Sequence, residues 1–121
     1  MKNKIIVSVK TEYLKEQSRM GEYVFTYHIC IRNVGEQAAK LLSRKWLITD
    51  ADGHKTEVQG SGVIGEQPLI QPQAEHQYSS FTVFKTPVGC MQGSYQMQAK
   101  DGTLFEVDVP MFTLAVQHIL Q

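Results

Sequence analysis

The sequence lacks a long hydrophobic run. Its first apolar stretch, Ile5-Ile6-Val7, ends at Ser8. A transmembrane helix needs about 20 consecutive apolar residues, and the stretch is also too short for the hydrophobic core of a secretory signal. We therefore expect a cytoplasmic protein that does not insert into membranes.

An excess of charge of one sign is also absent. Lys and Arg together number 12, and Asp and Glu together number 12, which gives a formal net charge of zero with neutral His. Proteins that bind nucleic acid polymers usually present a broad basic field, so we expect no such partner. The length, with 42% hydrophobic and 20% charged residues, predicts that residues 1–121 form a single globular domain.

Potential metal ligands are few and scattered. Cys30 and Cys90 match no zinc-binding spacing, and in a reducing compartment both are expected to be free thiols. The histidines show no metal-binding spacing either; we expect His28 on a sheet face and the other three in solvent, namely His54, His76 and His118. The sequence thus predicts no cofactor and identifies no metal site.

The run Asp50-Ala51-Asp52-Gly53 is similar to the start of a calcium-binding EF-hand loop. However, Lys55 stands where that loop needs Gly, and Ser61 stands where it needs Glu. Asp-Gly is a common sequence for a two-residue hairpin turn. We therefore expect a hairpin turn between strands at Leu41–Thr49 and Lys55–Gln59.

Helical periodicity is missing, and strand periodicity is clear. The tail Phe112–Leu120 comes nearest to a helical pattern but is rich in residues that favour strands. Apolar residues alternate with polar ones in three segments, which start at Ile5, at Glu22 and at Tyr95. These patterns predict strands with one buried face.

Turn signals separate these segments. Asp101-Gly102 predicts a hairpin within residues 94–109, and Gln77–Phe84 adds another β-rich run. Seven or eight strands without intervening helices indicate two packed antiparallel sheets, with a closed barrel as the alternative. Trp46 and Tyr95 fall where immunoglobulin-like sandwiches often place a core Trp and a corner Tyr, or they are ordinary core aromatics of another β fold.

One loop contains most of the candidate binding residues. Residues 60–74 show no clear period, yet include apolar Val63, Ile64, Leu69 and Ile70, and such long loops are usually functional or packed against the domain. These side chains either cap the sandwich or contact a partner.

The same loop contains Gly60, Gly62 and Gly65 in the order Gly-x-Gly-x-x-Gly, a pattern that binds pyrophosphate at a helix N-terminus. Pro68 follows where the helix would be needed, so the sequence predicts a turning loop without a helix dipole. If this loop binds a phosphate-rich small molecule, Arg44 and Lys45 are the candidate basic residues.

Catalytic patterns are missing as well. No Ser or Cys stands in a nucleophile elbow or beside a base that the sequence can identify. We identify no catalytic residue, and enzymatic activity has no support in the sequence.

Three stretches together resemble the ApaG family: Leu41–Asp50 (LLSRKWLITD), Gly62–Pro68 (GVIGEQP) and Thr86–Met97 (TPVGCMQGSYQM). The third is the most specific, because no general β pattern demands its order of residues. Three positions depart from the family pattern: Lys45 replaces a frequent His, Gln73 a frequent Gly and Cys90 a frequent Thr.

The resemblance implies a fibronectin type III-like sandwich and an association with cobalt resistance and magnesium efflux. It also implies a pyrophosphate-binding role for the glycine-rich stretch, and similarity to substrate-recognition modules of eukaryotic F-box proteins. We expect a non-enzymatic module that binds a protein partner through Gly60–Ala74. Binding of pyrophosphate or a nucleotide, with or without a divalent cation, is the alternative, and edge strands leave room for a dimer.

Overall fold

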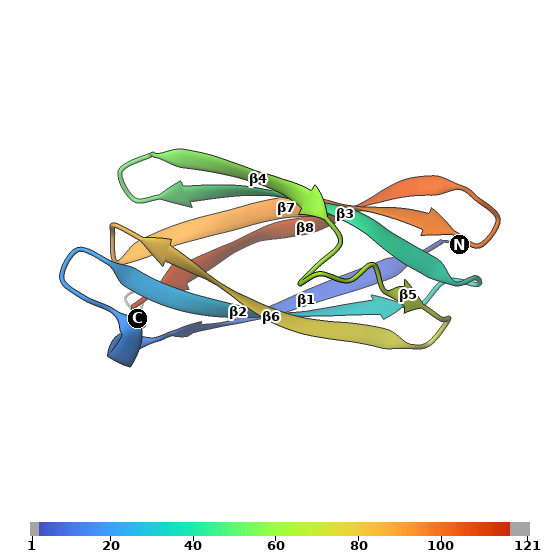
Figure 1. Ribbon diagram of the computed structural model, residues 1–121, viewed down its shortest axis with the longest axis horizontal. Coiled ribbons are helices and arrows are strands. Elements are labelled where there is room, and N and C mark those ends of the chain that lie inside the picture. Colours follow the sequence, from blue (N-terminus) through green and yellow to red (C-terminus); the bar gives the residue numbers. More distant parts are fainter. Residues whose placement is uncertain (1–2, 117–121) are drawn as a thin grey trace.

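Alternating apolar residues form long strands in the computed structural model, which describes residues 3–116. Nearly all of this range is extended, apart from turns and a single turn of 3-10 helix (Figure 1). The elements are β1 (Ile5–Tyr13), η1 (Lys15–Gln17), β2 (Tyr23–Asn33), β3 (Ala39–Asp50), β4 (Lys55–Ser61), β5 (Leu69–Ile70), β6 (Glu75–Phe84), β7 (Val88–Ala99) and β8 (Leu104–Ala115). The part of Phe112–Leu120 that is described, up to Val116, continues or follows β8 and is not helical. His118 lies outside the described residues.

The strands form two antiparallel sheets. One has the order β1-β2-β6, and the other has the order β4-β3-β7-β8, with the short β5 paired to the start of β3. Figure 1 shows the two sheets stacked as layers, with β4 and β6 on the same side of the sandwich. The prediction of an immunoglobulin-like or fibronectin type III-like sandwich is confirmed, and the barrel alternative is wrong because neither sheet closes on itself.

An aromatic cluster joins the two sheets. Trp46 of β3 makes edge-on contacts with Tyr27 of the opposite sheet, with Tyr95 of β7 and with Phe112 of β8, at ring-centroid distances of 5.8, 6.1 and 5.9 Å. Trp46 is paired with Gly93, where any Cβ would lie 2.7 Å from the indole ring. Edge-on packing of buried rings adds to their hydrophobic stabilisation, so the prediction of a core Trp is confirmed.

The role expected for Tyr95 is corrected. This residue lies well inside β7 rather than at its start, and its hydroxyl is hydrogen-bonded to the Tyr78 hydroxyl of β6. A corner Tyr would instead bond to the backbone. The two rings enter the core from different sheets, so their hydroxyls meet inside it. The bond between them gives each buried hydroxyl a partner.

A buried asparagine fixes the end of β2. The Asn33 side-chain amide donates to the Gln37 and Ile70 carbonyls at 2.9 Å each, and its oxygen accepts from the Gly35 amide. The backbone carbonyl of Asn33 accepts from Gln73, whose φ of 69° lies in the left-handed region. One residue therefore ties together β2, β5 and the turn before β6.

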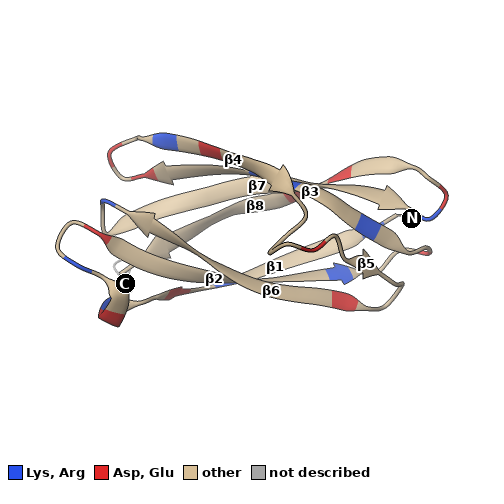
Figure 2. Ribbon diagram, viewed as in Figure 1, with Lys and Arg blue, Asp and Glu red and all other residues tan. Residues whose placement is uncertain are grey.

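The surface is mixed in charge. Figure 2 shows basic and acidic residues interspersed over both sheets on the visible face, in keeping with the zero net charge. His54 is exposed as predicted, whereas His76 is only half exposed and its ring lies 6.3 Å from that of Tyr78. Within residues 3–116, no helix is long and apolar enough to cross a membrane.

The buried tyrosine pair predicts a loss of stability in alkali. Burial raises the pKa of Tyr78 to about 12, and burial likewise raises the pKa of Tyr95, whereas an unfolded Tyr titrates near a pKa of about 10. As the pH rises, the tyrosines of the unfolded chain lose their protons before those of the folded chain. The free energy of unfolding is therefore constant with respect to these groups below about pH 10 and falls as the pH rises towards about 12. Tyr78→Phe should make this fall shallower in urea titrations between these pH values, and an unchanged profile would contradict the assignment.

Candidate functional site

The glycine-rich stretch folds into a tight turn rather than an open loop. The amide and carbonyl of Val63 bond to the carbonyl and amide of Glu66, at 2.8 and 3.0 Å. The two residues between them, Ile64 and Gly65, have φ values of 47° and 74°. This is a two-residue turn of the kind that closes β-hairpins, and we call residues 63–66 the Ile64 turn.

The expected loop, Gly60–Ala74, is more ordered than its sequence suggests. Gly60 belongs to β4, where it pairs with Arg44, and residues 69 and 70 form β5 on the edge of β3. The missing period thus reflects two short pairings and two turns in succession, and does not indicate a structureless connection.

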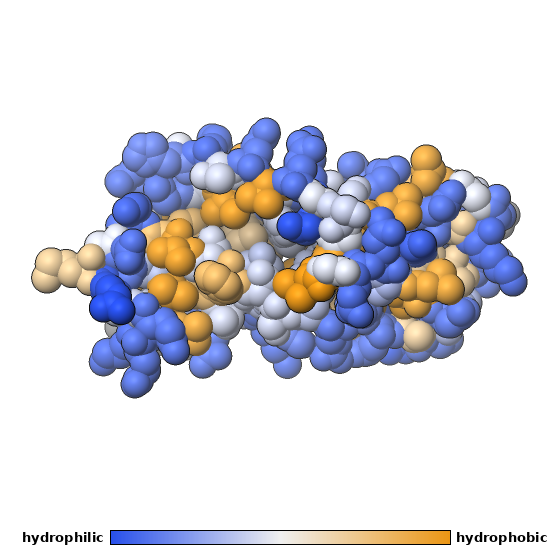
Figure 3. Space-filling model, in the orientation of Figure 1, coloured by the Kyte–Doolittle hydropathy of each residue, from blue (hydrophilic) through white to orange (hydrophobic). Residues whose placement is uncertain are grey.

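The four apolar side chains of this segment divide into two pairs. Val63 and Ile70 are buried in the core, whereas Ile64 is 61% exposed and Leu69 is 59% exposed. Figure 3 shows apolar side chains in separate groups on this face of the molecule, each surrounded by polar surface. Two of the four side chains therefore contribute to the core, and the other two are left exposed.

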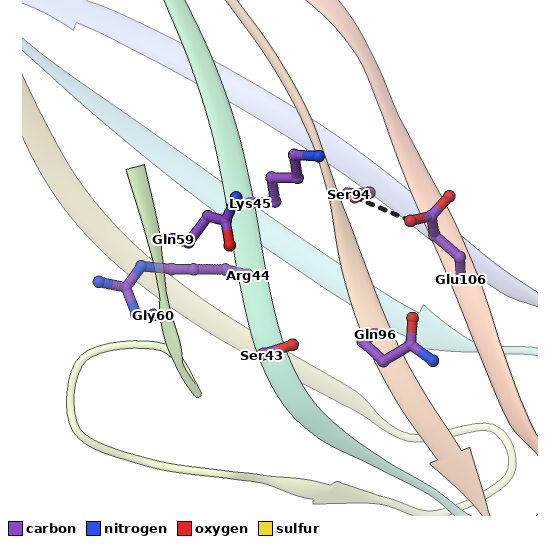
Figure 4. A pocket seen from close by; sticks show the side chains of 8 residues that line it. All are labelled: Ser43, Arg44, Lys45, Gln59, Gly60, Ser94, Gln96 and Glu106. Carbon is purple, nitrogen blue, oxygen red and sulfur yellow. Dashed lines mark hydrogen bonds between the residues drawn. The ribbon is translucent and has the colours of Figure 1, made fainter. Parts of the chain in front are cut away.

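Arg44 and Lys45 leave β3 on opposite faces. Arg44 is paired with the buried Tyr95 and Lys45 with the outward Ser94, as expected for adjacent residues of a strand. Figure 4 shows Arg44 reaching past Gly60 while Lys45 extends away from it. The guanidinium Nη1 donates to the carbonyls of Ser61 and Gly62 at 3.2 and 3.0 Å.

Steric and backbone constraints within the protein explain why glycine stands at these three positions. A Cβ at Gly60 would lie 2.6 Å from the Arg44 guanidinium, and one at Gly62 would lie 2.1 Å from the Glu66 carbonyl oxygen. Gly65 takes the left-handed φ that the turn requires. No helix follows, as predicted, so the dipole of a phosphate-binding loop is missing from this segment.

A shallow hollow lies on the outer face of the larger sheet. It encloses about 480 Å³ and is lined by Ser43, Arg44, Lys45, Gln59, Gly60, Ser94, Gln96 and Glu106 (Figure 4). Ser94 donates a 3.3 Å hydrogen bond to Glu106. The sequence does not reveal this hollow, because its lining comes from four strands; the outward Ser and Gln residues of β7 are the one sequence signal of a polar face.

The Asp50-Ala51-Asp52-Gly53 run forms the predicted hairpin turn. Asp50 Oδ1 accepts hydrogen bonds from the Asp52 and His54 amides at 2.9 and 3.0 Å. Desolvation by itself raises the pKa of Asp50. These hydrogen bonds, together with His54, outweigh it and hold the pKa of Asp50 below its ordinary value. The potential ligand atoms of Asp50, Asp52 and His54 lie within 4.8 Å of one another, but closing the turn already accounts for the Asp50 carboxylate.

The half-buried thiol of Cys30 is not activated. Desolvation, followed by the nearby Glu75 carboxylate, raises the pKa of Cys30, and its sulfur lies 3.4 Å from Glu75 Oε2. A nucleophilic cysteine needs the opposite shift. Both cysteines are free thiols, as predicted.

The left-handed conformation of Ile64 predicts stored strain. A β-branched residue in this region costs about 1–2 kcal/mol relative to right-handed backbone. Replacing it by glycine removes that strain but costs about 0.5–1 kcal/mol, because the unfolded chain gains conformational freedom. Ile64→Gly should therefore raise the free energy of unfolding by up to about 1 kcal/mol, measured by urea denaturation. Gly65→Ala is the matched control and should lower it, because alanine disfavours the same conformation.

Comparisons with known proteins agree with this architecture. Residues 13–99 match the family described as the ApaG domain. The chain is 54% identical over 121 residues to Protein ApaG of Thiobacillus denitrificans, covering 98% of this chain and 95% of that protein. It is 52% identical over 116 residues to Protein ApaG of Pseudomonas paraeruginosa, covering 94% of this chain and 92% of that protein.

Solved structures give the same result. The putative ApaA protein from Bordetella pertussis superposes with a TM-score of 0.94 at 39% identity, covering 96% of each chain. The structural genomics target SoR45 superposes with a TM-score of 0.90 at 49% identity, covering 95% of this chain and 89% of that one. With this agreement in sequence and in fold, the chain belongs to the ApaG domain family.

Proposed function

We propose that this domain is a non-enzymatic module that binds a protein partner through the exposed side chains of Ile64 and Leu69. The main support for the proposal is that Ile64, an apolar residue, has left-handed backbone and 61% of its surface exposed. Strained backbone of this kind clusters at functional sites. An exposed apolar side chain held in a rigid turn is suited to fill a pocket on another protein.

The surroundings of Ile64 support a fixed contact surface. The Ile64 turn is closed by two backbone hydrogen bonds, and Arg44 holds the carbonyls of the two residues that precede it. Leu69 lies on β5, which is paired to β3 and tied to Asn33 through Ile70. The two apolar side chains are therefore held by a framework that does not depend on a partner.

Binding of pyrophosphate or a nucleotide is the competing proposal. The amides of Ile64 and Gly65 make no hydrogen bond among residues 3–116 and could face an anion. The Arg44 guanidinium, however, donates to backbone carbonyls, and Lys45 leaves the other face of β3. The cobalt and magnesium association implied by the family, and the cytoplasmic location, stay predictions.

Capture of partners from a lysate tests the proposal. Immobilised wild-type protein should enrich one or more proteins that Ile64→Asp with Leu69→Asp recovers at least tenfold less, because a buried carboxylate without a partner strongly disfavours association. Quantitative mass spectrometry of the bound fractions gives the measurement. Urea unfolding must first show that the variant is as stable as the wild type within about 1 kcal/mol.

The matched control is Leu104→Asp, which places the same charge at a residue of β8 that is 58% exposed. Equal recovery by both variants would contradict a role for the Ile64 turn. Calorimetric titration with pyrophosphate and nucleotides tests the competing proposal. Saturable heat that Ile64→Asp abolishes would favour anion binding through the turn amides, because the added carboxylate would repel an anion there.

A further inference from the structure

One edge of the smaller sheet is open along ten residues. Among the strands of residues 3–116, β6 pairs with β2 on one side and with none on the other. The Asn33 amide of β2 donates to the carbonyl of Ala74, just before β6. Because alternate residues of an antiparallel strand direct their backbone groups to the same side, the even-numbered residues of β6 bond to β2 and the odd-numbered ones face outward, from Glu75 to Val83.

Apart from β5, which is only two residues long, the other edge strands carry the charges or prolines that normally prevent pairing between molecules. The charged or proline residues within those edge strands are Lys10 and Glu12 in β1, Lys55 and Glu57 in β4, and Glu106, Asp108 and Pro110 in β8. Between its first residue and its end, β6 has neither a charged residue nor a proline. It is therefore the edge among the described strands that is left open to pairing.

The two ends of β6 carry opposite charges. Glu75 is its first residue, and Lys85 directly follows its last. Figure 2 shows β6 uncoloured between an acidic residue at one end and a basic residue just beyond the other. Such an arrangement is self-complementary: when two copies run antiparallel, each acidic end meets a basic end.

We propose that β6 is the site at which a second copy of this chain binds, through antiparallel β6–β6 pairing about a two-fold axis at Ser80. In this register, Glu75 lies opposite Lys85 of the second copy, Gln77 opposite Val83 and Ser79 opposite Phe81. All of these pairs join odd-numbered residues, whose backbone groups face the open edge. The result is one continuous sheet with the order β1-β2-β6-β6-β2-β1.

Apolar side chains support the same partner. Phe81 is 66% exposed and Val83 is 47% exposed, and both lie on the outer face of the sheet beside Thr26 and Val24 of β2. Figure 3 shows apolar surface grouped over the end of the molecule where β6 ends. About the two-fold axis the Phe81 rings of the two copies become diagonal neighbours, a distance that aromatic side chains span.

The charge pairs select this register over its neighbours. Shifting the pairing by two residues about Phe81 would place Lys85 opposite Gln77 and leave Glu75 without a basic partner. Lys85 makes no ion pair or side-chain hydrogen bond within residues 3–116, whereas Glu75 lies 3.7 Å from Arg32 of its own chain. Lys85 of the second copy would therefore complete a row of alternating charges.

Sedimentation velocity of the full chain, from micromolar to millimolar concentration, tests the proposal. We expect a reversible equilibrium between monomer and dimer, weakened at least tenfold by Phe81→Lys and by Val83→Lys, each of which puts a charge in the middle of the edge. Leu104→Lys is the matched control on β8, with a similar exposed fraction, and should leave the equilibrium unchanged. A monomer at all concentrations, a species larger than a dimer, or equal effects of Phe81→Lys and Leu104→Lys would overturn the proposal.

A charge exchange tests the register. Lys85→Glu should weaken the dimer several-fold, because the two-fold axis repeats the lost pair and sets two acidic residues against each other twice. Adding Glu75→Lys to that variant restores the opposite charges and should recover most of the affinity. Lys100→Glu is the control for net charge and should have no effect; failure of the double variant to recover would overturn pairing about Ser80.

Discussion

Contact between Trp46 and the rings around it sets the geometry on which the rest of this domain depends. Its partners come from β2, β7 and β8, so the one side chain fixes how far apart the two sheets lie and how they are turned. Gly93 provides the space that the indole occupies. Two residues before Trp46 on the same face of β3, Arg44 points towards the edge, where the core ends and the Ile64 turn begins. The placement of the candidate site therefore follows from the packing of the core.

Arg44 shows how a basic residue beside glycines can be structural. A guanidinium offers five donors and no acceptor, and here it satisfies carbonyls at the end of β4. The same residues, read only as a sequence, match an anion-binding pattern. The hydrogen bonds show the structural role directly, because Nη1 of the guanidinium donates to the carbonyls of Ser61 and Gly62.

The sequence was sufficient for the fold, since period-2 alternation and the Asp-Gly turns specify strands and hairpins locally. It was less informative for residues 60–74, where β5 is only two residues long and is defined by its pairing with Ala39 and Lys40. The sequence could not distinguish the buried Val63 from the exposed Ile64, because Val63 precedes a two-residue turn and Ile64 is the first residue at its tip. It also could not reveal the bond between Tyr78 and Tyr95, which join from different sheets. Gln73 has a left-handed φ, a backbone conformation that favours glycine.

The closed form of the Ile64 turn also affects the thermodynamics of any association that uses it. A segment that orders only on contact loses conformational entropy at that moment, which weakens binding for a given contact area. Here the backbone around Ile64 is ordered before any partner arrives, so most of that cost was met when the domain folded. Binding through so small a surface could then rest on few side chains, and its specificity would come from the fixed shape of the turn rather than from the extent of the contact.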